Sequence, residues 1–349
     1  MKVLILSYPL DKTHNPYVGT LMKSINAQFD DVQWICDLDS IWDDKILKSL
    51  DIIHIQWPNQ LVLKHTAKDV EELLMKVKKN SIRLVVTCHN YEPHYVKKED
   101  EVKAYKLVYS NADVMLHLGK ESCEVMTKSY PQVRHEIIYH HIYNDLFPET
   151  YNQDFCRKRI GLKQKHTYVL CFGLFRNDEE RDFIASVAEM LKSYNITIVA
   201  PSFYRMPERR NKLALIKPLI RLYYEKWKHP NIIMSRKYIS DAELPYYYGA
   251  ADAAVLQRLH ILNSGNVPLA FWLGKVVVGP DEGNVGPLLK EFSNPVFDAT
   301  KPETAVQGIL KAIELAKRGL GVKNREQAKR LFSTDVVANH LYNIYSSLL

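Results

Sequence analysis

The residues best suited to chemistry follow the apolar segment RLVVTC at positions 83–88. His89 and Asn90 come directly after it, and Glu92 and His94 stand in the same short loop. Histidine titrates near neutral pH and often acts as a general base, and glutamate is the usual carboxylate alternative. We therefore expect His89 or Glu92 to take a proton from a substrate. A histidine at the end of a strand is also a common structural residue, so both interpretations stay open.

A second group of small and polar residues precedes a helical pattern in the C-terminal half, where the sequence reads Asn263-Ser264-Gly265-Asn266. Small residues let the backbone approach a ligand, and the first N–H groups of a helix lack partners within the helix. Ser264, Gly265 and Asn266 are therefore predicted to bind a diphosphate through backbone amides. Taken alone, the same residues are more typical of a helix cap than of a binding site.

The loop after the apolar segment at 168–172 contains Gly173 and Arg176. A guanidinium binds a diphosphate through two parallel hydrogen bonds and stabilises charge that develops on a leaving group. Gly173 and Arg176 are therefore added to the predicted diphosphate site. The alternative is that Arg176 pairs with the acidic residues at 178–180.

The elements that must position these residues are strands alternating with helices. Such alternation predicts right-handed βαβ units and parallel sheets, which bind ligands at the carboxyl ends of their strands. One helical stripe consists of Val70, Leu73, Leu74 and Val77, and another helix is expected at 19–29. The expected strands are 2–8, 32–36, 51–57, 83–89, 112–118 and 135–141, and then 168–175, 196–200, 231–234, 251–257 and 275–280.

The alternation pauses over residues 142–165 and then restarts, which predicts two lobes. A chain of 349 residues also exceeds what one hydrophobic core usually serves. We expect an N-terminal domain at 1–150 and a C-terminal domain at 151–349 that includes a closing helix at 332–349.

The formal net charge is +7, and Arg205–Lys228 is a basic segment with interspersed apolar residues. This segment predicts peripheral contact with an anionic membrane, or alternatively a helix whose basic face is solvated. Charge alone does not predict a nucleic-acid partner. The five scattered cysteines and the absence of a long apolar run indicate a cytoplasmic protein, with the inner face of the membrane as one location.

The segment from Tyr238 to Gly283 carries ordered blocks that resemble the donor-binding half of GT-B glycosyltransferases, of the type in family 4-like bacterial enzymes of cell-surface polysaccharide assembly. The resemblance extends to YVLCFGLFRNDEERD, which opens this half, and to LFSTDVVANHLYNIYSSLL, which resembles the closing helix. The blocks are Ile239-Ser240-Asp241 through Asp252, Leu269-Ala270 with Gly274-Lys275, and Pro280 to Gly283.

The resemblance implies two Rossmann-like, doubly wound lobes that face a cleft, with a closing helix able to cross back to the first lobe. It implies transfer of a hexosyl group from a nucleotide diphosphate sugar, UDP more than GDP, to a saccharide or lipid-linked saccharide in polysaccharide or glycan biosynthesis. The first domain would bind the acceptor and the second the donor. No cofactor and no metal are expected, and inversion or retention stays open.

The resemblance also assigns roles to individual residues. His89 would be the base or a contact to the donor sugar. Glu243 and Lys275 would bind the nucleotide or sugar. The acceptor would be bound by Asn15, Tyr17, Asn90 and His94.

Departures from the family pattern keep alternatives open. Many retaining members carry two glutamates across the loop, at positions where this chain has Ile261 and Leu269. Where the family pattern has a lysine, this chain has Glu179, and Arg181 and Lys275 are the candidates to take the role of that lysine. A nucleotide-sugar epimerase on the same fold, or a catalytically inert glycan- or nucleotide-binding subunit, are the alternative functions.

Two apparent metal motifs are interpreted as structural. Asp37-Leu38-Asp39 has the spacing of a metal-binding Asp-x-Asp signature, but it lies between a strand and a helix, where aspartate commonly caps. His140 and His141 are adjacent, and adjacent residues on a strand point to opposite faces.

Overall fold

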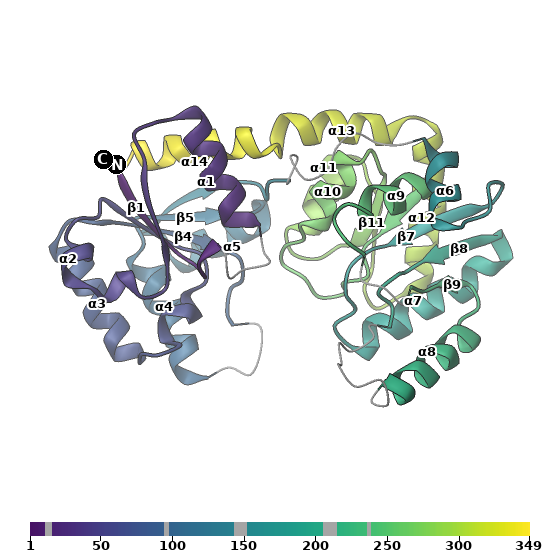
Figure 1. The fold of residues 1–349 in the computed structure, drawn as a ribbon, viewed down its shortest axis with the longest axis horizontal. Helices are drawn as coiled ribbons and strands as arrows, with labels where there is room; N and C mark the ends of the chain where they lie inside the picture. Colours follow the sequence, from purple (N-terminus) through teal and green to yellow (C-terminus); the bar gives the residue numbers. More distant parts are fainter. Residues whose placement is uncertain (11–15, 94–97, 143–151, 205–214, 236–238) are drawn as a thin grey trace. The chain divides into compact units, whose positions relative to one another are not determined.

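The computed structural model describes residues 1–10, 16–93, 98–142, 152–204, 215–235 and 239–349. The chain forms two compact units, Met1–Tyr143 with Leu331–Leu349, and Asn144–Arg330 (Figure 1). Each unit contains a six-stranded parallel sheet with helices around it, so the expected pair of doubly wound α/β lobes is confirmed. The closing helix belongs to the first unit, whereas the expected domain 151–349 had included it.

The sheet of the first unit has the order β2-β1-β3-β4-β5-β6. β1, β3, β4 and β5 are almost entirely buried, because helices cover both faces of a parallel sheet. The strands are β1 (Lys2–Leu6), β2 (Gln33–Asp37), β3 (Ile52–Ile55), β4 (Arg83–Cys88), β5 (Val114–His117) and β6 (Arg134–Ile137).

The helices of the first unit include α3, whose buried residues are Ala67 and the four of the predicted stripe. A capping box between Thr66 and Asp69 fixes where α3 begins. The last helix, α14, packs against α1, where Phe29 stacks on Tyr342. The helices are α1 (Tyr17–Gln28), η2 (Ser40–Trp42), α2 (Asp44–Leu47), η3 (Pro58–Val62), α3 (Ala67–Lys79), α4 (Glu99–Asn111), α5 (Lys120–Ser129) and α14 (Thr334–Ser346).

The sheet of the second unit has the order β12-β11-β10-β7-β8-β9. All predicted strands are present, and β12 is an additional strand too short to show a period in sequence. The strands are β7 (Thr167–Cys171), β8 (Ile196–Val199), β9 (Ile232–Ile233), β10 (Ala253–Val255), β11 (Val277–Pro280) and β12 (Val296–Phe297).

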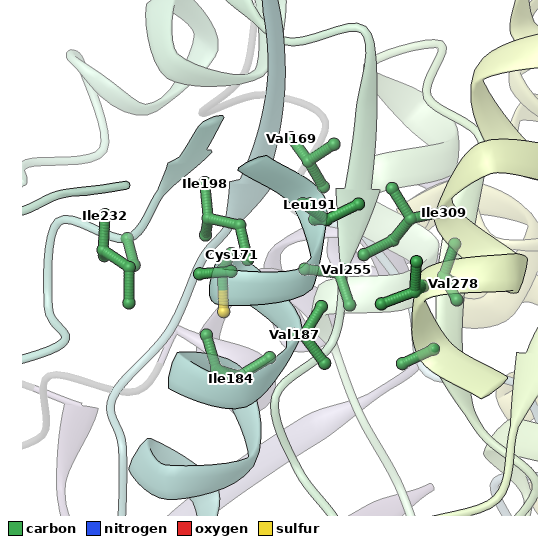
Figure 2. Close-up of a cluster of buried hydrophobic side chains, with 14 of the residues drawn as sticks. Val169, Cys171, Ile184, Val187, Leu191, Ile198, Ile232, Val255, Val278 and Ile309 are labelled. Atoms are coloured by element: carbon green, nitrogen blue, oxygen red, sulfur yellow. The ribbon is translucent and has the colours of Figure 1, made fainter. Parts of the chain in front are cut away.

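Helices α7 and α12 cover the second sheet and contribute Ile184, Val187, Leu191 and Ile309 to its core (Figure 2). Within the described segments, no helix has the length and apolar character needed to cross a membrane. The helices are α6 (Gln153–Ile160), α7 (Asp178–Leu191), η4 (Lys192–Tyr194), α8 (Ile216–Lys228), α9 (Leu244–Ala250), α10 (Asn266–Trp272), α11 (Val285–Glu291), α12 (Pro302–Lys317) and α13 (Leu320–Leu331).

Candidate active site

Both sheets have a point where the strand order reverses. In the first sheet β1 lies between β2 and β3, and in the second β7 lies between β8 and β10. Open α/β sheets bind ligands outside the carboxyl ends of the strands at such a point. The residues that follow β1, β3 and β4, and those that follow β7 and β10, are therefore the candidates in each unit.

A row of four hydrogen-bonded side chains leads to the edge of the first sheet. His89 Nε2 lies 2.9 Å from Gln56 Oε1, and Gln56 Nε2 lies 3.1 Å from His54 Nε2. His54 Nδ1 lies 2.5 Å from the hydroxyl of Tyr345, which α14 supplies. We call these four residues the hydrogen-bond relay.

The hydrogen positions in the relay follow from its donors and acceptors. His54 Nε2 also lies 2.8 Å from the Thr87 hydroxyl. With the Gln56 amide oriented as in the structure, it donates to His54 Nε2, so His54 carries its proton on Nδ1 and donates to Tyr345. Burial lowers the pKa of His54 to about 3, which keeps this ring neutral. Gln56 Oε1 accepts from His89 Nε2–H, so the neutral His89 ring has its lone pair on Nδ1.

Aromatic rings surround His89. Trp57 stacks on it with ring centroids 4.8 Å apart, and Tyr17 contacts it edge-on at 5.5 Å. Tyr17 also packs against His140 and His141, whose pKa values are lowered by burial. Tyr17 is only 3 % exposed, so it supports His89 by packing and has little surface for the predicted acceptor contact.

The other predicted residues of the first unit lie outside the relay. Asn90 is buried, and its carbonyl accepts from the Tyr109 hydroxyl at 2.5 Å. Glu92 is on the exposed surface of the following loop. Asn15 and His94 lie outside the described residues.

At the edge of the second sheet, Gly173 is enclosed by two side-chain amides. Asn266 Nδ2 donates to Phe172 O at 3.0 Å, and Gln257 Nε2 donates to Leu174 O at 3.2 Å. A Cβ at position 173 would lie 2.9 Å from Asn266 Nδ2 and 3.0 Å from Gln257 Nε2, and the φ angle is +120°. Gly173 is therefore fixed both by its conformation and by the close approach of the two amides.

The loop that contains Ser264 and Gly265 is held by the turn after β11. Asn284 Nδ2 donates to Asn263 Oδ1 at 2.7 Å, and a Cβ at Gly283 would lie 2.3 Å from Ile261 O. Ser264 Oγ accepts from the Asn266 amide at 3.3 Å, which is the local cap considered above. The close contact explains physically why a glycine ends the block from Pro280 to Gly283.

The buried carboxylate of Glu180, near the beginning of α7, forms hydrogen bonds with two arginines. Glu180 is 4 % exposed and accepts from the Arg176 amide at 2.7 Å. Nη1 of Arg258 lies 2.7 and 3.0 Å from its two oxygens. Arg181 pairs with Asp178 at 2.6 Å, while the Arg176 side chain is exposed.

The structure corrects the prediction for Lys275. This residue precedes β11 and so lies at the amino edge of the sheet, opposite to the candidate edge. Its ammonium donates to Ala251 O at 2.8 Å beside the Arg157–Asp252 ion pair, and burial lowers its pKa to about 8. Lys275 therefore anchors structure and is not placed to bind the nucleotide.

Glu243 lies where α9 begins, and its carboxylate accepts from the Ser240 amide at 3.2 Å and hydroxyl at 2.9 Å. Asp37 accepts from the amides of Asp39 and Ser40, so its interpretation as a cap is confirmed. Among the residues that the structure describes, no group of three or more His, Cys, Asp or Glu side chains is arranged to hold a metal ion.

Several residues of these edges were missed by the sequence analysis. His54 interrupts an apolar strand, and Arg258 follows directly after one, which are usable signals. Tyr345 gives no local signal, because it is 291 residues from its partner His54. The missed residues are His54, Thr87, Gln257, Arg258 and Tyr345.

No family model and no curated protein sequence matches this chain. Solved structures do match over its whole length. Sucrose-phosphate synthase of Thermosynechococcus elongatus superposes with a TM-score of 0.73 and 14% identity, covering 99% of this chain and 98% of that one. HepE of Anabaena, solved in complex with UDP-glucose, has a TM-score of 0.67 and 13% identity, covering 99% and 100%.

A UDP-N-acetylglucosamine 2-epimerase structure from Listeria monocytogenes matches with a TM-score of 0.57 and 12% identity, covering 98% of this chain and 94% of that one. Identities this low establish the fold alone. With two doubly wound parallel sheets and full-length matches to glycosyltransferase structures, the chain has the GT-B fold.

Proposed function

We propose that the protein transfers a hexosyl group from a nucleoside diphosphate sugar to a hydroxyl of a saccharide or lipid-linked saccharide. The observation that carries the proposal is the enclosed Gly173 at the switch point of the second sheet. Its contacts with Asn266 and Gln257 bring the loop after β7, the loop after β10 and the beginning of α10 together at the edge where open α/β sheets bind ligands, in a chain with the GT-B fold. UDP is preferred to GDP because the Anabaena neighbour was solved with UDP-glucose.

The donor would be held by the second unit. The exposed Arg176 guanidinium would bind the diphosphate, and the backbone amides of Gly173, Ser264 and Gly265 would add neutral donors. Asn266 would hold this loop in place, because its own amide donates to Ser264 Oγ. The leaving diphosphate gains negative charge as the glycosidic bond breaks, so these groups act most strongly in the transition state. Glu243, at the beginning of α9, is proposed to contact the nucleotide.

The acceptor would be activated in the first unit by His89. With its proton on Nε2, the ring offers Nδ1 to the acceptor hydroxyl. The hydroxyl oxygen would bond to the anomeric carbon as its proton passes to His89, and the bond to the diphosphate would break. If the reaction retains configuration, His89 would instead bind the sugar.

We place this metal-independent reaction in cytoplasmic glycan or polysaccharide biosynthesis. All five cysteines are free thiols, which suits a reducing compartment. An acceptor on a lipid carrier would be reached at the inner face of a membrane.

Arg176→Ala tests the donor site, with Arg181→Ala as the matched control. Both arginines lie near the beginning of α7, so the control reports the loss of a positive charge at the same end of the helix from a residue held by Asp178. Loss of a charged hydrogen-bond donor to a phosphate costs about 1.5–3 kcal/mol, a drop in UDP affinity of about 10- to 150-fold. Thermal shift with UDP- and GDP-sugars measures it. Absence of any shift with every nucleotide would refute the donor site.

The epimerase is the second candidate, because an epimerase structure shares the fold. A transferase releases UDP in proportion to added acceptor. An epimerase converts its sugar without acceptor, so chromatography of the products distinguishes the two reactions. Nucleotide binding without either reaction would indicate an inert binding subunit, which the apolar Ile261 and Leu269 also permit.

A further inference from the structure

Helix α8 presents a row of large apolar side chains to solvent, which we call the α8 stripe. At about 100° per residue in an α-helix, the five side chains fall within an arc of about 100°. On this helix only Leu222 is buried, on the opposite side, where it joins the core of the second unit. The members of the stripe, with their exposed fractions, are Ile216 (50 %), Ile220 (64 %), Tyr223 (60 %), Tyr224 (53 %) and Trp227 (77 %).

Basic side chains border the stripe along both sides. The one acidic residue of the helix, Glu225, is turned inward with its side chain 13 % exposed, and it contacts Arg221 at 3.5 Å and His229 at 3.6 Å. The outward surface of α8 is therefore apolar in the centre and positive at its margins. The basic residues are Lys217, Arg221 and Lys228 on one side and Lys226 on the other.

The local sequence explains why the helix forms although so little of it is buried. Pro218 lies in the first turn, where a missing N–H breaks no helical hydrogen bond. Lys226 and Lys228 lie in the last turn, where positive charge interacts favourably with the helix dipole. An apolar row on the outer side of a regular helix indicates an interaction surface, because large exposed apolar patches are rare on soluble monomers.

We propose that α8 lies flat on an anionic lipid bilayer, with the α8 stripe inserted at the headgroup boundary. Tyrosine and tryptophan favour this boundary because their rings are apolar and their tips are polar. Lysine and arginine on both sides match a flat negative surface, and their long stems let the charges reach it. This arrangement corresponds to an interfacial helix and not to a spanning one.

The position of α8 in the fold suits this role. The helix connects β8 to β9, which is the last strand on its side of the second sheet, and it lies at the lower margin of that unit in Figure 1. The pKa of Asp178 is lowered mainly by Arg181 and also by Arg221 of α8, so the helix lies near the beginning of α7. The basic segment Arg205–Lys228 had suggested membrane contact from its charge, and the stripe assigns the inserted residues.

Flotation with vesicles tests the proposal. The full chain is mixed with vesicles of pure phosphatidylcholine, or of phosphatidylcholine with about one third phosphatidylglycerol. The stripe variant Ile220→Ser, Tyr223→Ser and Trp227→Ser is compared with a control variant, Leu63→Ser, Met75→Ser and Val322→Ser, in which equally exposed apolar residues are removed elsewhere. A charge variant carries Lys217→Gln, Arg221→Gln and Lys228→Gln.

We expect the parent and the control to bind the anionic vesicles, and the stripe and charge variants to bind at least tenfold more weakly. Binding should also fall at least tenfold between low and high salt, because surface charge is screened. Thermal unfolding checks that every variant is folded. Equal flotation of the stripe variant and the control, or no flotation of the parent, would overturn the proposal.

Light scattering of the same samples tests the alternative that the α8 stripe binds a second copy of this chain. A dimer of the parent that becomes a monomer in the stripe variant would assign the stripe to a second copy of this chain and overturn the bilayer proposal. Vesicle binding requires no sugar donor. Its failure and the failure of the proposed transfer reaction can therefore be observed separately.

Discussion

Tyr345→Phe removes one hydroxyl and so tests whether the relay controls His89. The hydroxyl accepts the Nδ1–H of the buried His54 at 2.5 Å. A buried N–H left without an acceptor costs about 1–3 kcal/mol, and we expect the free energy of unfolding to fall by that amount. Tyr342→Phe is the matched control, since it removes a hydroxyl from the same helix that bonds the exposed Asp31.

Part of this loss of stability is avoided if the hydrogen bonds of the relay reverse their donor and acceptor roles. His54 would move its proton to Nε2 and donate to Thr87, which lies 2.8 Å away. Gln56 would then turn its amide, and His89 would keep its proton on Nδ1 instead of Nε2. Each 1.4 kcal/mol that favours reversal lowers the share of His89 with an acceptor at Nδ1 about tenfold.

Two measurements distinguish this explanation from a loss of packing. Long-range ¹⁵N–¹H correlation of the histidine rings reports the tautomer of His89 directly, without any substrate. In turnover assays kcat should fall about tenfold, while KM for the donor stays constant, because the proposed donor site belongs to the other unit. If Tyr345→Phe matches Tyr342→Phe in stability and leaves the His89 signals unchanged, the relay does not set the tautomer.

Three further predictions concern the second unit. Arg258→Met leaves Glu180 buried without its guanidinium and should lower the free energy of unfolding by about 3–5 kcal/mol in urea titrations, with partial recovery in the double variant carrying Glu180→Gln. Gly173→Ala should destabilise by about 1–3 kcal/mol and weaken UDP-sugar binding in calorimetry, because φ is +120° and two amides meet the new Cβ. Lys275 has its pKa lowered from 10.5 to about 8, so folding favours the neutral amine. Relative to Lys275→Met, the parent should therefore gain about 3 kcal/mol between pH 8 and 10.5, and a constant difference would contradict this.

The sequence predicts the strands well because each is a buried apolar run. Their ends are harder to predict, and β7 shows the reason. The apolar pattern continues to Phe175, but the strand ends at Cys171. Gly173 has a positive φ, and the neighbouring carbonyls accept side-chain amides from Asn266 and Gln257 in place of a strand partner. Those amides come from distant segments that no local pattern reveals.

Some residues of the candidate site can be predicted from the sequence and others cannot. His89 and Gly173 can be placed at sheet edges from sequence, because each follows a recognisable strand. The prediction that Lys275 binds the nucleotide was wrong because the whole block that contains it was interpreted as one binding segment. A residue that precedes a parallel strand lies at the amino edge of the sheet, opposite to the edge that binds ligands. The relay could not be predicted, since its members come from β3, β4 and α14 and meet only in the folded unit.

The two edges use opposite electrostatics, and this contrast bears on the proposed reaction. Burial lowers the pKa of His54 and keeps the inner ring of the relay neutral. In the arrangement described above, the Gln56 amide accepts from His89 Nε2. At the second sheet, Glu180 neutralises Arg258 while Arg176 extends to the surface. A proton acceptor in one unit and a phosphate-binding cation in the other would accept the two charges that glycosyl transfer separates, the acceptor's proton and the leaving diphosphate. This contrast is what the proposed reaction requires if His89 acts as its base.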